Sequence, residues 1–210
     1  MVATNKDYAN GGQMLDPAKS KQNEIGVRFK TGNVLNNISY FDITQENTID
    51  SLENGKKYLR VDGEQNNRGF EWSFNGNIAE KWDVIGGIMY LDATQKKTSK
   101  AELNGKTVNG AAEWSGVLGA IYHADDKMSL IGRVNYVDST TINNGTLEVP
   151  STVTFDLGAS YKTKLSNTPV TFDLMCYNVA GKDYWKARSG SSSLSLGAPR
   201  TITLSATFDI

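Results

Sequence analysis

Apolar and polar residues alternate with a period of two along most of this chain, from about residue 22 to its end. A period of two is typical of a β-strand with one face in an apolar environment, because successive side chains point to opposite sides. The helical period of 3.6 residues is almost absent. The pattern predicts an all-β protein with nine strands, at residues 22–30, 34–46, 66–77, 82–94, 112–123, 127–138, 150–163, 169–180 and 198–210.

The connections between the predicted strands alternate in length. Short ones lie at 31–33, 77–81, 124–126 and 164–168, and long ones rich in Gly, Asn, Ser and Lys at 47–65, 95–111, 139–149 and 181–197. Short and long connections therefore fall at opposite ends of the sheet. This arrangement is typical of antiparallel up-and-down transmembrane β-barrels, whose short turns lie on the periplasmic side.

Aromatic residues of the apolar phase gather at the ends of the predicted strands. Membrane barrels place such rings at both water interfaces, so we expect two aromatic girdles and an apolar face turned to lipid. The girdle at the short turns is predicted to hold Phe29, Phe74, Trp82, Tyr122, Tyr161 and Phe208, and the other girdle Tyr90, Trp114 and Tyr136.

The opposite phase is predicted to carry charge, which suits a wet or plugged lumen better than the packed interior of a small barrel. Its charged members are expected to be Glu24, Arg28, Asp42, Arg68, Glu71, Arg133, Asp156 and Asp173.

Composition excludes several other classes of protein. Hydrophobic residues make up 39% of the chain, and no apolar run approaches the roughly 18 residues that a spanning helix needs. The net charge of −1 carries no basic blocks, so we expect no nucleic-acid partner. One histidine, His123, and one cysteine, Cys176, provide no zinc cluster, and we predict neither a metal site nor a cofactor. The first residues lack the features of a signal peptide.

Two other functions compete with a membrane barrel that transports a ligand. An enzyme on the barrel rim would need a base near a nucleophile, but His123 is predicted at the short-turn end beside Asp125 and Asp126, away from the long loops where such sites lie. We therefore predict no enzyme. A soluble or small self-closing β-barrel that binds a ligand remains the alternative, and it would place Phe208 and Trp82 inside the barrel.

The amino-acid sequence resembles the C-terminal part of the barrel in TonB-dependent ferric-siderophore receptors of the ferrichrome type. Seven segments in order carry the resemblance, at 15–27, 40–47, 61–71, 86–93, 155–161, 178–185 and 197–209.

The resemblance implies a bacterial outer-membrane receptor that imports an iron(III)-siderophore without making or breaking covalent bonds. It also implies that residues 1–210 supply about nine C-terminal strands of a larger, twenty-two-strand barrel, without the plug domain or the segment that contacts TonB. Nine strands of such a barrel cannot close and leave two edges unpaired, so we expect a truncated or mis-started reading frame, or an excised fragment, that transports nothing alone. The expected partners are the siderophore, outer-membrane lipid and, through the N-terminal part, the TonB system.

Five residues of the predicted long loops are candidates for ligand contacts, because aromatic rings and guanidinium groups suit a chelate with apolar surface and oxygen acceptors. These residues are Tyr58, Arg60, Tyr184, Trp185 and Arg188.

Overall fold

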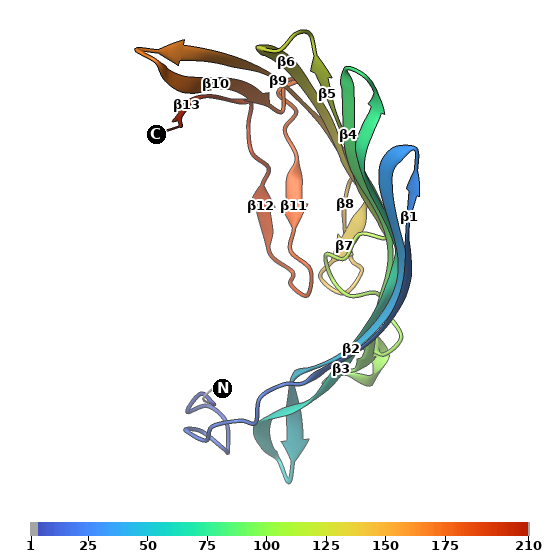
Figure 1. Ribbon diagram of the computed structural model, residues 1–210. Helices are drawn as coiled ribbons and strands as arrows, with labels where there is room; N and C mark the ends of the chain where they lie inside the picture. Colours follow the sequence, from blue (N-terminus) through green and yellow to red (C-terminus); the bar gives the residue numbers. More distant parts are fainter. Residues whose placement is uncertain (1–3, 210) are drawn as a thin grey trace.

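The computed structural model describes residues 4–209, and most of them form one curved antiparallel sheet (Figure 1). The nine predicted strands are confirmed, and they lie side by side in chain order. Residue 210, the predicted end of the last strand, lies outside the described residues. The strands are β1 (Ser20–Thr31), β2 (Asn33–Glu53), β3 (Lys56–Ala79), β4 (Trp82–Lys97), β5 (Trp114–His123), β6 (Met128–Val137), β9 (Thr152–Leu165), β10 (Thr168–Tyr177) and β13 (Thr201–Phe208).

The long connections contain small elements of their own. These are the 3-10 helix η1 (Ala101–Leu103), the hairpin of β7 (Thr140–Ile142) and β8 (Leu147–Val149), and the hairpin of β11 (Trp185–Ala187) and β12 (Leu194–Leu196). The β11–β12 hairpin lies on the concave side of the sheet (Figure 1). None of the described residues forms a helix that is long and apolar enough to cross a membrane.

The prediction of a loop at 47–65 was wrong, because β2 and β3 continue through it as one long hairpin. The hairpin turns at Asn54 and Gly55, whose φ angles are 48° and 74°. A two-residue turn with both φ angles positive matches the right-handed twist of the flanking strands, and Asn-Gly is its preferred sequence. The Asn-Gly pair was therefore the local signal that could have identified the hairpin.

The strand register shows that one face of the sheet is apolar, since residues directly opposite each other share a face. Tyr90 lies opposite Trp114 with ring centroids 5.0 Å apart, and Trp82 lies opposite Tyr122 at 4.9 Å. These pairs put four of the nine predicted girdle residues on one face, in two rows at opposite ends of β4 and β5. On β4 and β5, nine residues separate one girdle from the other, counting both ends, which agrees with the 9–11 residues of a tilted membrane-spanning strand.

Large apolar side chains on this face remain exposed, among them Leu204 at 72% and Ile202 at 67%. A contiguous apolar surface of this kind needs a nonaqueous neighbour. The rows between the apolar ones face the opposite, concave side. They carry the charged residues Glu24, Arg28, Glu71, Arg133, Asp156 and Asp173. The apolar face is thus the convex one.

Two predicted lumen residues lie on the other face. Asp42 pairs with Arg68, and Arg68 with Asp92, in the row that directly follows Tyr40, Phe70 and the girdle residue Tyr90. Side chains keep alternating between the two faces beyond the edge of the membrane. The convex face therefore turns from lipid-facing to water-facing while the same alternate residues still form it. The charge of Asp42 and Arg68 therefore marks the upper limit of the apolar band.

Candidate functional site

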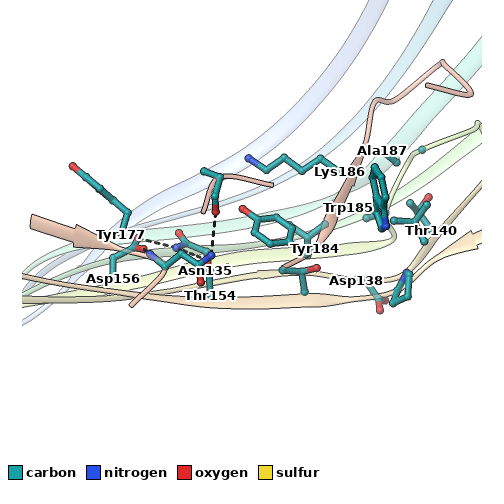
Figure 2. Close-up of a pocket in the computed structure, with 18 residues that line it drawn as sticks. Asn135, Asp138, Thr140, Thr154, Asp156, Tyr177, Tyr184, Trp185, Lys186 and Ala187 are labelled. Carbon is teal, nitrogen blue, oxygen red and sulfur yellow. Dashed lines mark hydrogen bonds between the residues drawn. The ribbon is translucent and has the colours of Figure 1, made fainter. Parts of the chain in front are cut away.

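A cavity of about 470 Å³ lies between the β11–β12 hairpin and the concave face of β6, β9 and β10 (Figure 2). The short loops around β7 and β8 complete its wall. Concave sites with a few convergent polar groups are the usual places where ligands bind. Its lining includes Asn135, Asp138, Asp156, Tyr177, Asn178, Tyr184, Trp185 and Lys186.

The floor of the cavity contains the buried carboxylate of Asp156. The Asp156 carboxylate accepts hydrogen bonds from Nε of Arg133 at 2.8 Å and from Nδ2 of Asn135 at 3.1 Å. Its side chain is only 5% exposed, whereas that of Arg133 is 42% exposed. A buried charge is tolerated when it is paired and hydrogen-bonded in this way. The floor is therefore polar and fixed in position.

Tyr184 and Trp185, two of the five candidates, both line the cavity, with Tyr184 nearer the floor and Trp185 toward Thr140 and Asp138 (Figure 2). The ammonium group of Lys186 lies 5.7 Å from the centroid of the Tyr184 ring. The hairpin thus presents two aromatic rings and a cation to the lumen, a combination that suits a ligand with planar groups and oxygen acceptors.

The Tyr184 ring packs on the bare backbone of Gly197, which donates its N–H to the Tyr184 carbonyl at 2.8 Å. A Cβ atom at position 197 would lie 2.3–2.5 Å from three ring carbons, so Gly197→Ala should displace the ring while the sheet still forms. The measurement is 19F NMR of the receptor labelled with fluorotyrosine, where the Tyr184 resonance should shift. Gly132→Ala, whose Cβ would make only an ordinary contact at 3.9 Å, is the control and should leave this resonance unchanged.

Arg188 lies just beyond β11, and it is not part of the cavity lining. Its neighbour in space is the turn at Asn109 and Gly110, where a Cβ atom on Gly110 would lie 2.4 Å from the Arg188 carbonyl oxygen. The Gly190 N–H donates to the Asn109 carbonyl at 2.8 Å. The tip of the β11–β12 hairpin is thus held against the loop that joins β4 to β5.

Tyr58 and Arg60 lie on the long β2–β3 hairpin and form a separate group. A bulge beside Asn47 shifts the register, and it puts both residues on the same side of the sheet as the lumen-facing residues of β2. The Arg60 guanidinium lies 5.3 Å from the Tyr58 ring centroid and pairs with Glu53 at 2.8 Å. The five candidates therefore fall into two places, of which only the β11–β12 hairpin borders the cavity.

The N-terminal segment packs along this long hairpin. The Ala9 N–H donates to the Lys57 carbonyl at 2.7 Å, and the Tyr8 hydroxyl donates to Asp50 at 2.7 Å. Lys57 also pairs with Asp50 at 2.8 Å. These two donors, Lys57 first and Tyr8 second, lower the pKa of the Asp50 carboxyl below its ordinary value.

Because the Asp50 pKa is lowered in the packed state, the contact stabilises that state above the ordinary aspartate pKa of about 3.9 and loses this contribution as the pH falls through the lowered value. We therefore expect acidification below about pH 4 to weaken this contact and loosen the segment. A nitroxide on Lys6→Cys, in a Cys176→Ser background, should become more mobile over this range. Asp50→Asn should remove most of the pH dependence, and an unchanged transition in that variant would assign the loosening to another group.

His123 has partners that the sequence did not reveal. One ring nitrogen lies 2.7 Å from Oδ2 of Asp83 and the other 3.0 Å from Oγ of Ser129, both on neighbouring strands. The predicted position of His123 at the short-turn end is confirmed, and strand pairing adds Asp83 and Ser129 as partners of its ring. The three residues lie at the short-turn end, and none of them lines the cavity under the β11–β12 hairpin.

The curved antiparallel sheet, with its lipid-facing convex side and polar concave side, defines part of the wall of an outer-membrane β-barrel. Residues 2–179 match the family of TonB dependent receptor-like β-barrels, and the chain belongs to this family. The family consists of outer-membrane receptors and transporters, not enzymes.

Three similar proteins are named as ferrichrome, ferric preacinetobactin and siderophore receptors. The ferrichrome receptor FcuA of Yersinia enterocolitica is 28% identical over 97% of this chain and 27% of its own length. The crystal structure of BauA, the ferric preacinetobactin receptor of Acinetobacter baumannii, matches with a TM-score of 0.84 and 35% identity, covering all of this chain and 32% of that one. The siderophore receptor PiuA of the same species matches at 0.76, with 24% identity over 92% of this chain and 29% of that one.

The chain thus spans about a quarter to a third of the length of these relatives. The comparisons confirm the resemblance seen in the sequence, and they disfavour the alternative of a soluble or self-closing barrel. Within the described residues, β1 and β13 also form the two edges of an open sheet rather than a closed barrel.

Proposed function

We propose that this chain serves in an outer-membrane receptor that binds an iron(III)-siderophore and imports it with energy from the TonB system. The contact with TonB would be made through the N-terminal part of the receptor. The observation that carries this proposal is the cavity on the lumen side of the wall, because a transported ligand must pass along this surface.

The residues of the β11–β12 hairpin have the chemistry for first contact with such a ligand. Tyr184 and Trp185 offer flat apolar surfaces, and Lys186 offers a cation to the oxygen atoms of the chelate. Arg188, Tyr58 and Arg60 would extend the contact surface outside the cavity. The iron would travel as cargo held by the siderophore, so the receptor itself would need no metal ligands.

The test is uptake of radioactive iron by cells that lack their own chelate receptors and produce the complete receptor. Ferrichrome, an iron(III)-catecholate complex and ferric citrate would each be supplied. We expect uptake of at least one complex, and its abolition by a protonophore. If the cells import none of the three complexes in a protonophore-sensitive way, the proposal is wrong.

A variant links the uptake to the cavity. Trp185→Ala should lower the affinity for the imported complex by roughly tenfold, because a buried aromatic contact commonly carries that much binding energy. Leu147→Ala is the control, since Leu147 is exposed on β8 and does not line the cavity. Equal effects of the two substitutions would mean that the binding site lies outside this cavity.

A further inference from the structure

The loop that carries Tyr184 and Trp185 is closed at its base by one side chain, that of Asn178. Its Nδ2 donates to the carbonyls of Lys182 at 2.8 Å and Ala198 at 3.0 Å, and its Oδ1 accepts the Lys182 N–H at 2.9 Å. These bonds join the two ends of the loop, one directly after β10 and the other shortly before β13. Asn178 is only 4% exposed, so the bonds are sheltered from water.

The backbone of Asn178 is fixed as well. Its N–H donates to Oδ1 of Asp156 at 2.8 Å, and the next N–H, that of Val179, donates to the Phe155 carbonyl at 2.7 Å. Asp156 in turn is held by Arg133 on the other side of β9. A chain of short bonds therefore runs from β6 through β9 to the loop.

The conformation of Asn178 also limits which residue can stand there. Its φ angle is 48°, in the left-handed region that Asn and Gly adopt most readily. Glycine could take the same backbone shape but would lose all three side-chain bonds. Aspartate would keep an acceptor for the Lys182 N–H, but it would turn a carboxylate toward two carbonyl oxygens. Only asparagine satisfies the backbone, the donor groups and the acceptor together.

We propose that Asn178, anchored by Asp156, is a positioning residue that fixes the β11–β12 hairpin over the concave face and so presets Tyr184 and Trp185 for the ligand. The role in ligand binding rests on the proposed function. The role in placing the hairpin rests only on the hydrogen bonds of Asn178 and Asp156. A preset loop binds more tightly than a mobile one, because the entropy of ordering it is not lost on binding.

The test uses the complete receptor in lipid vesicles, with the variants Asn178→Gly and Asn178→Asp. Hydrogen exchange at the amides of residues 182–198 should become about tenfold faster or more in both variants, because the base of the loop is opened. The matched control is Asn143→Gly in the β7–β8 loop. Asn143 also has a positive φ, of 52°, but its side chain makes no hydrogen bond among the described residues.

Two further measurements separate positioning from a general loss of structure. Exchange in the nine sheet strands should stay unchanged in both variants, which shows that the wall is intact. The dissociation constant for whichever of ferrichrome, the iron(III)-catecholate complex and ferric citrate the unaltered receptor binds should rise about tenfold.

Each outcome bears on a separate claim. Exchange within twofold of the unaltered receptor at residues 182–198 overturns the positioning role of Asn178. Faster exchange with an unchanged dissociation constant overturns the presetting of the ligand contacts. If the unaltered receptor binds none of the three complexes, the proposed function fails, and the exchange rates still decide whether Asn178 holds the hairpin.

Discussion

Replacing Leu118 by arginine should destabilise the barrel by about 2–4 kcal/mol, the usual cost of a cation on the lipid face at the middle of the bilayer. Leu118 lies midway between the girdle residues Trp114 and Tyr122 on β5, and its register partners Gly86 and Val134 belong to the convex face. The measurement is the free energy of unfolding in urea for the complete receptor in lipid vesicles, followed by tryptophan fluorescence.

The adjacent residue provides a matched control. Val117 is 42% exposed and Leu118 is 49% exposed, so their simple accessibility hardly differs. Val117 points to the lumen, where it lies opposite Asn135. Val117→Arg should therefore cost much less than Leu118→Arg. The reverse order would mean that the convex face is wet and the concave face apolar, as in a soluble barrel.

Replacing Asp156 by alanine should lower the free energy of unfolding by about 1–3 kcal/mol, because hydrogen-bond donors buried beneath the cavity lose their common acceptor. The loss should exceed that expected from deleting an ordinary hydrogen bond, since Asp156 also accepts bonds from Asn135 and from the Asn178 backbone. The same urea titration measures the effect, and hydrogen exchange of residues 182–198 should rise with it.

The sheet contains a second pair of nearly identical geometry for comparison. Arg68 bonds to Asp92 through Nε at 2.9 Å and through a terminal nitrogen at 2.8 Å, but on the water-exposed end of the convex face. Solvent screens such a pair, so Asp92→Ala should cost only a small fraction of the loss at Asp156. Equal losses at the two positions would show that burial is not what makes the Asp156 pair important.

The fold was largely readable from the sequence, because alternation is a local signal that each strand carries by itself. The apolar phase of Ile202, Leu204, Ala206 and Phe208 needs no knowledge of the neighbouring strands. Charge, by contrast, misassigned Asp42 and Arg68, although alternation puts them in the phase of Tyr40 and Phe70. Charge indicates water, and both the lumen and the space beyond the girdle contain water.

The candidate site was less predictable, because it depends on contacts between distant parts of the chain. Residue type selected Tyr184 and Trp185, and the structure puts them at a cavity, although their role in binding remains a proposal. The partners of Asn178 lie 4, 20 and 22 residues away in the chain. No periodic pattern contains such spacings, so the base of the loop became visible only in three dimensions.

The direction of the two edge strands limits how this wall can be extended. All eight neighbouring pairs in the sheet are antiparallel, from β1 with β2 to β10 with β13. An even number of reversals restores the starting direction, so β1 and β13 run the same way. An antiparallel ring that contains this sheet therefore needs an odd number of additional strands. Such a ring can gain or lose a whole hairpin and still close, whereas the gain or loss of a single strand would force a parallel seam.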